Sequence, residues 1–311
     1  DHDPITKESK GLLFEESRTN QLIFSSDITD NGSQNSGYSI TNGTVTGDQT
    51  TAPDGTTTAD QFAANSTNNI HRVSIYFTSG QISNSTGYTF SVFVKQITGN
   101  SAERYCELET AQHSTWTHAG GSPTFDLQNG TMNTSNASSN ITGTIESYPD
   151  GWYRISMTST TGTTTNDTGF YFNHTSSNGD STQTLATTEG FYFWGAQIEK
   201  GNYITSHIPT YGATATRGVD VVRVEGQELS DFYDTSEWTL LTITDATPAS
   251  LVASPASVND IGFIGTNGNN YYKIRYVTDS TLDDAYIDGY GTSNSSVQFD
   301  FGGSHNEVDT S

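Results

Sequence analysis

Residues 88–95 read YTFSVFVK, and their alternation decides the fold class. Tyr88, Phe90, Val92 and Val94 occupy every second position, so in an extended chain they line one face of a strand. Similar patterns occur in residues 152–157 and 170–172, whereas residues 191–198 read FYFWGAQI, a nearly continuous apolar run typical of a strand covered on both faces. Turn-forming residues separate these stretches, and no long helical periodicity is present. The sequence therefore predicts an all-β chain built as a jelly roll or β-sandwich.

The composition fits many short strands joined by polar loops. Hydrophobic residues make up only 32% of the chain, and the formal net charge is -23, a combination that also occurs in disordered chains. However, 16 Tyr, 15 Phe and 4 Trp require a packed interior. Ser, Thr, Asn and Gly take the place of the missing apolar residues, and these types suit strands and turns.

The charge excludes several classes of partner. With only 12 Lys and Arg, the chain lacks the clustered cations that nucleic acids and anionic membranes require. No apolar run approaches the roughly 18 residues of a membrane span, and no signal peptide is visible. The single cysteine, Cys106, cannot form an intrachain disulfide, and its alternation with Leu108 predicts a buried small side chain.

Two domains are expected. Residues 1–18 read as an extended lead-in, residues 19–208 as the jelly roll, residues 209–218 as a small, flexible linker, and residues 219–311 as a second β domain. The second region has its own strand patterns but is short for a two-sheet lectin sandwich. We therefore expect it to be half-sized or incomplete.

Five segments look familiar as an ordered set: residues 1–4 (DHDP), residues 11–20 (GLLFEESRTN), residues 52–60 (APDGTTTAD), residues 125–154 from FDL to GWYR, and residues 193–217 from FWGAQIE to ATR. In order and spacing they resemble a module of tailed-bacteriophage virion proteins, such as tail fibres and other exposed structural components. The resemblance covers residues 1–218 and is specific as a set, although each segment alone is weak. Residues 219–222 and 231–233 match the following domain only loosely.

The resemblance implies a carbohydrate-binding jelly roll, often followed by a concanavalin-like domain, on the surface of the virion. Because Asp1 would lie mid-chain in that family, it also implies a piece of a longer protein. Phage fibres are commonly homotrimers, so we expect a symmetric homo-oligomer that contacts other virion proteins and binds glycans through repeated weak sites. Two alternatives remain: a purely architectural decoration or adaptor protein without a sugar ligand, and an accessory domain of a polysaccharide depolymerase.

Sugar recognition usually pairs a flat aromatic ring with hydrogen-bonding groups. The loop from Tyr105 to Trp116 has these residue types, and we predict ligand contacts by Tyr105, Gln112, His113 and Trp116. The alternative is that Trp116 packs beneath its own loop or in a subunit contact. Modules of this general kind often carry a structural Ca²⁺, for which the candidate ligands near strand ends are Asp27, Asp60 and Glu199.

We expect no catalysis. Residues 179–181 (GDS) read as a turn without a motif-placed histidine, and His113 with His118 does not make a zinc pattern. Glu103, Glu107 and Glu109 are close in sequence, and alternation places Glu107 and Glu109 on one strand face with Tyr105. Such a face is either an acid-containing sugar platform or an ordinary exposed sheet surface.

Overall fold

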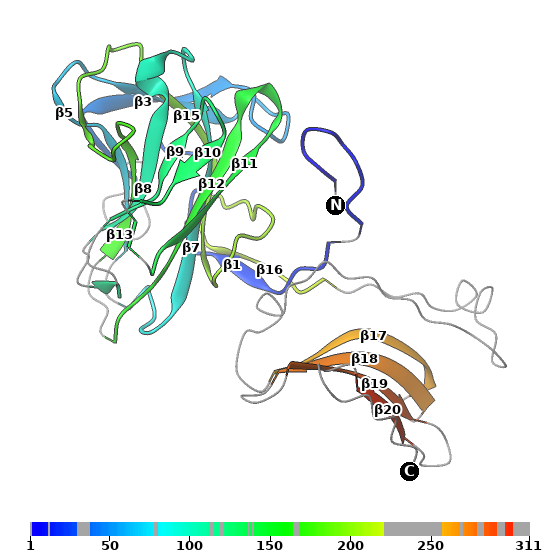
Figure 1. Ribbon diagram of the computed structural model, residues 1–311. Coiled ribbons are helices and arrows are strands. Elements are labelled where there is room, and N and C mark those ends of the chain that lie inside the picture. Colours follow the sequence, from blue (N-terminus) through cyan, green and yellow to red (C-terminus); the bar gives the residue numbers. More distant parts are fainter. Residues whose placement is uncertain are drawn as a thin grey trace. The chain divides into compact units, whose positions relative to one another are not determined.

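The chain is divided into two compact units, residues 1–223 and 224–311, in a computed structural model (Figure 1). The structure describes residues 2–220 except residues 12, 30–37, 78–79, 112–114, 118–120, 136, 139 and 164–167, and it describes the backbone of four strands between residues 257 and 300. None of the helices in these described parts is long and apolar enough to cross a membrane.

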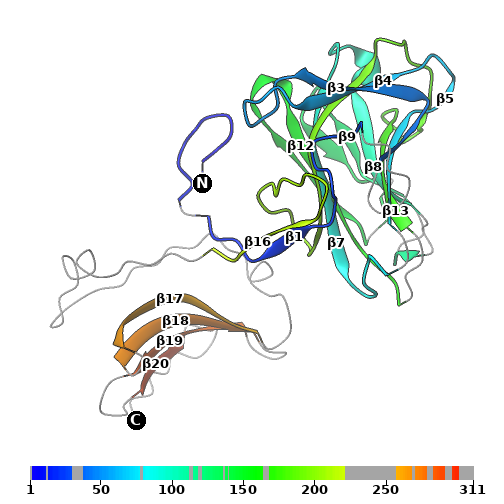
Figure 2. The ribbon, with the colours of Figure 1, turned by 180° about the vertical axis from the view of Figure 1, so that it is seen from behind.

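Two six-stranded antiparallel sheets form the first unit (Figures 1 and 2). The first sheet has, in spatial order, β10 (Thr131–Asn133), β9 (Thr124–Asp126), β8 (Tyr105–Ala111), β13 (Thr168–His174), β6 (Arg72–Phe77) and β2 (Tyr38–Thr41). The second sheet has β11 (Thr142–Ser147), β12 (Tyr153–Thr160), β7 (Gly87–Gln96), β15 (Gly190–Lys200), β4 (Ala59–Ala64) and β3 (Gly43–Thr50).

Smaller elements complete this unit: the strand pairs β1 (Arg18–Asn20) with β16 (Ala215–Arg217) and β5 (Asn69–Ile70) with β14 (Thr182–Gln183), and the 3-10 turns η1 (Ser101–Glu103) and η3 (Pro149–Gly151). The second unit contains one antiparallel meander of β17 (Ser257–Asn267), β18 (Asn270–Thr278), β19 (Asp283–Tyr290) and β20 (Ser296–Asp300). The predicted fold class, an all-β sandwich followed by a smaller β unit, is confirmed, and the sandwich is compatible with a jelly roll.

Aromatic rings join the two sheets. Phe170 of β13 lies 5.3 Å, between ring centroids, from Phe90 of β7, and Phe172 lies 4.4 Å from Phe193 of β15 in an edge-to-face arrangement. Such pairs contribute about 0.5–1.5 kcal/mol beyond the burial of their area. Cys106 and Leu108 of β8 are buried in the same core, as their alternation predicts.

A β-bulge in β15 keeps the apolar side chains inside. The pairing of β15 with β7 shifts register between Trp194 and Gln197, and Gly195 has a φ of +61°, which favours glycine. Before the bulge Phe193 faces the core, and after it Ala196 does, so the inward positions change from odd to even. Trp194 packs on the other face of the sheet in a second, smaller apolar cluster.

The stretch 209–218, expected to be a linker, contains β16. Its residues pair with β1, from Arg18 opposite Arg217 to Asn20 opposite Ala215. Asn20 is buried, and its amide donates to the carbonyls of Ala196 and Ile208 while its oxygen accepts from the backbone N–H groups of Leu22 and Ile198. This side chain therefore attaches the lead-in to the sandwich.

Replacing Asn20 with Ala should lower the free energy of unfolding by about 3 kcal/mol, because it leaves several buried backbone groups without partners. Urea denaturation followed by tryptophan fluorescence measures this loss. Asn68→Ala, at an exposed loop position, is the control and should change stability by less than about 0.5 kcal/mol. Equal stabilities of the two variants would contradict the role given to Asn20.

Candidate functional site on the outer face of the first sheet

The outer face of the first sheet is the strongest candidate site. Residues opposite one another in an antiparallel sheet share a face, and the buried Phe170 and Phe172 assign the intervening positions to the outside. We call this outer surface the polar face; its residues are Tyr105, Glu107, Glu109, Thr124, Asp126, Thr131, Asn133, Tyr171, Asn173, Arg72, Ser74 and Tyr76.

A hydrogen-bonded row runs across the middle of the polar face. The Asn173 amide nitrogen donates to Glu107 Oε1 at 2.8 Å and to Glu109 Oε2 at 2.9 Å. The Asn173 oxygen accepts from Arg72 Nε at 2.5 Å, and Arg72 Nη2 lies 3.1 Å from Glu109 Oε2. Side chains from β8, β13 and β6 are therefore held in one fixed arrangement.

Two tyrosines and an arginine occupy the β13–β6 side of this row. The guanidinium carbon of Arg72 lies 3.8 Å from the ring centroid of Tyr171. Tyr76 meets Tyr171 edge to face at 5.9 Å and remains 38% exposed. This corner offers an aromatic surface beside charged and amide groups.

The β8–β10 side contains a recess of about 210 Å³, lined by Tyr105, Thr124, Asp126, Thr131, Met132, Asn133 and Ser177. Asp126 accepts two hydrogen bonds from Arg104, at 2.8 and 2.6 Å. The Arg104 hydrogen bond lowers the pKa of Asp126, so this carboxylate is ionised at neutral pH. Arg104 also lies 4.9 Å from the ring centroid of Tyr105, so the tyrosine wall is supported from one side.

Glu107 differs from the other carboxylates of the polar face. It is only 8% exposed, and burial raises its pKa to about 7, although the hydrogen bond from Asn173 acts in the opposite direction. Because one amide nitrogen reaches both acids, Glu107 Oε1 and Glu109 Oε2 are at most 5.7 Å apart, the sum of 2.8 and 2.9 Å. The site thus combines a carboxyl group that titrates near neutrality with a second carboxyl group paired to Arg72.

The predicted ligand residues have different locations. Tyr105 lines the recess, whereas Gln112 and His113, like His118, lie outside the described residues. Trp116 is only 5% exposed, packs against Phe170 at 5.1 Å, and donates from Nε1 to Thr168 Oγ1 at 2.8 Å. An indole buried in this way has no exposed face for a sugar, so the expectation for Trp116 is corrected: it packs in the core beside Phe170 and Thr168.

The three predicted calcium ligands do not form one site. Asp60 is buried, accepts from the N–H groups of Ile28 and Asp48, and has a pKa raised to about 6 by burial. Glu199 is buried and accepts from Gln197 and Thr205, and it lies six residues along β15 from the partner of Asp60, roughly 20 Å away. Asp27 is exposed and caps Thr29. Within the described residues, no three acidic, His or Cys side chains gather in a metal-binding group.

Two further sequence candidates serve local structure. Both carboxylate oxygens of buried Glu103 accept backbone N–H groups, Oε2 from Thr98 and Gly99 and Oε1 from Gly190. The GDS stretch forms a turn in which Gly179 N–H donates to the Ser176 carbonyl.

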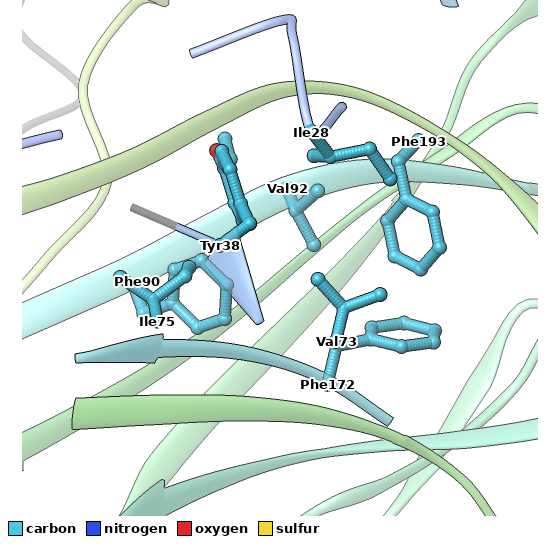
Figure 3. Close-up of a pocket in the computed structure, with 9 residues that line it drawn as sticks. Ile28, Tyr38, Val73, Ile75, Phe90, Val92, Phe172 and Phe193 are labelled. Carbon is cyan, nitrogen blue, oxygen red and sulfur yellow. The ribbon is translucent and has the colours of Figure 1, made fainter. Parts of the chain in front are cut away.

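A small internal void lies between the sheets and belongs to the core. Its volume is about 10 Å³, and Figure 3 shows the side chains around it, among them Ile28, Val73, Phe90, Phe172 and Phe193. A space of this size with apolar walls binds neither a ligand nor a well-held water molecule. The polar face is consequently a better candidate for a binding site than this void.

Comparisons with known proteins do not add a family to this picture, because neither a family model nor a curated protein sequence matches the chain significantly.

Tyr171, Asn173 and Arg72 join Tyr105 on the polar face, although no sequence motif marks them. One signal was present, since Tyr171 lies between Phe170 and Phe172 and alternation alone turns it away from the core. The contact of Arg72 with Asn173 joins positions 101 residues apart and depends on strand register. Strand register of this kind cannot be predicted from a local sequence pattern.

Glu107→Gln should make the protein more stable at pH 8 than the unchanged protein, by roughly 3 kcal/mol, with little difference at pH 4.5. The sign follows from the raised pKa: between pH 4.5 and 7 the folded state keeps a proton that the unfolded state releases, so stability decreases as pH rises. Urea titrations across this pH range measure the difference. Glu8→Gln, on the exposed lead-in, is the control substitution. A stability difference between Glu107→Gln and the unchanged protein that does not vary with pH would contradict the assignment.

Proposed function

We propose that residues 1–220 form a glycan-binding module and that the polar face is its binding surface. The observation that carries this proposal is the recess beside Tyr105, where an aromatic ring lies next to Asp126, Thr124, Thr131 and Asn133. Sugars present both apolar C–H faces and hydroxyl groups, which match an aromatic ring surrounded by hydrogen-bonding side chains.

The order of the polar side chains favours recognition over a plain solvated surface. Exposed polar side chains lose rotamer entropy when a ligand fixes them. Here the buried Asn173 and its partner Arg72 already hold the half-buried Glu109 in place, so much of that cost is met on folding. A preorganised face gives useful affinity with few contacts.

The setting of the module rests on the resemblance to virion proteins of tailed bacteriophages. We propose that the chain is displayed on the virion surface, as part of a tail fibre or other exposed component, in a symmetric homo-oligomer such as a trimer that contacts other virion proteins. Repeated weak sites would then bind host-surface or environmental glycans with high avidity. In a purely architectural protein the polar face would have no sugar ligand.

A second candidate function is glycoside hydrolysis, because Glu107 Oε1 and Glu109 Oε2 are at most 5.7 Å apart, which is compatible with the carboxyl separation of roughly 5 Å in retaining glycosidases. Glu107, with a pKa near 7, would be the acid. We favour binding because Glu109 is already engaged by Arg72 and Asn173 and because Glu107 is nearly buried.

Tyr105→Ala should reduce glycan binding at least tenfold, since it removes the aromatic wall of the recess. A glycan array with the full chain, followed by calorimetry on a positive glycan, measures the effect. Tyr211→Ala is the matched control, because Tyr211 is 85% exposed and lies off the polar face. An array without any signal above background would contradict the proposed function.

The hydrolysis candidate gives a separate prediction. Incubating the protein with each polysaccharide that it binds should release no reducing ends, and Glu107→Gln should still bind. If the unchanged protein releases reducing ends and both Glu107→Gln and Glu109→Gln do not, the protein is a glycoside hydrolase.

A further inference from the structure

Both guanidinium groups of the polar face and its border are already paired with carboxylates of the protein. Arg104 makes two hydrogen bonds to Asp126, and Arg72 forms an ion pair with Glu109. Among the described side chains of this face and its border, three carboxyl groups (Glu107, Glu109 and Asp126) therefore stand against two guanidinium groups. An anionic sugar would have to break one of these pairs and would meet an excess carboxylate once Glu107 ionises.

Uncharged sugar hydroxyl groups fit the same arrangement without breaking it. Carboxylate oxygens accept hydrogen bonds from hydroxyl groups, and the face also offers an exposed hydroxyl group in Thr131 and an exposed amide group in Asn133. The net charge of -23 for the whole chain adds a long-range repulsion against polyanions. Both effects favour a neutral ligand.

The aromatic contact points are too far apart for one sugar ring. Tyr105 lies in the recess on β8, whereas Tyr76 lies two strands away on β6, opposite Gly169, which in turn pairs with Ala111. From Tyr105 to Ala111 the strand advances six residues, or roughly 20 Å, and two strand spacings add about 10 Å sideways. A ligand that contacts both tyrosines is a chain of several sugars.

Building on the proposed function, we infer that the ligand is a neutral polysaccharide that lies diagonally across the polar face from the Tyr105 recess to Tyr76. Tyr105 contacts a sugar at one end of this track and Tyr76 contacts one at the other. Between them lie the half-buried side chains of Glu109, Tyr171 and Arg72, which the buried Asn173 supports. Affinity therefore increases with the length of the oligosaccharide until both tyrosines are reached.

Native gels that contain a single polysaccharide test the charge of the ligand with the full 311-residue chain. Neutral dextran, mannan, galactan and arabinoxylan are compared with anionic alginate and polygalacturonate, each at low and at physiological salt. We expect at least one neutral polymer to retard the protein and neither anionic polymer to do so. Retardation by the anionic polymers alone, if it is lost in Tyr105→Ala, would overturn the inference that the ligand is neutral. It would still support glycan binding at the polar face.

Calorimetry with oligosaccharides of increasing length, cut from the retarding polymer, tests the track. We expect Tyr76→Ala to weaken the longest oligosaccharide about fivefold to tenfold and to leave the shortest unchanged, whereas Tyr105→Ala weakens all of them. Tyr76→Phe, which keeps the ring, should bind like the unchanged protein and controls for folding. An equal effect of Tyr76→Ala at every length, or none, would overturn the track. Absence of binding to every polymer and every array glycan would overturn the proposed function itself.

Discussion

The packing of Phe170 and Phe172 between the two sheets is the constraint on which the rest depends. Side chains of a strand alternate, so burying these two rings against Phe90 and Phe193 leaves Tyr171 and Asn173 no position except the outer face. Because β13 pairs with β8 on one side and β6 on the other, the same choice aligns Glu107, Asn173 and Arg72 in one row. The two faces of β13 therefore contribute to the core on one side and to the candidate site on the other.

This coupling also explains the chemistry of Glu107. The row holds its carboxyl group beside Asn173 on the neighbouring strand, and loss of hydration raises its pKa toward neutrality. Its neighbour Glu109, two residues along the strand, makes an ion pair with Arg72. Two acids on one strand face consequently have different environments. Glu107 lies between Asn173 of β13 and Thr124 of β9, whereas Glu109 lies opposite Tyr171 of β13 and pairs with Arg72.

Much of the fold could be predicted from local sequence, and little of the site. Alternation in residues 88–95 and 170–172 was sufficient for the strands and for the sandwich, since burial follows directly from a period of two. The row could not be predicted, because Arg72 and Asn173 meet only through strand register. Trp116 looked like a loop aromatic, but the cost of leaving an indole in water favours its burial in the core against Phe170. Asp60 and Glu199 looked like metal ligands, yet both are occupied by N–H and hydroxyl donors of their own neighbourhood.

The pairing of β1 with β16 has a mechanical consequence. The chain enters and leaves the sandwich at neighbouring positions. There the backbone carbonyl of Glu15 accepts a hydrogen bond from the N–H group of Asp220, and the Arg217 guanidinium donates to the Glu15 carboxylate. A force that pulls these two ends apart acts across the antiparallel pair and along its hydrogen bonds, so it peels them one residue pair at a time. Peeling reaches Asn20 last, and its four buried hydrogen bonds then carry the load. Under tension the β1–β16 pair would therefore open before the buried contacts of Asn20 are broken.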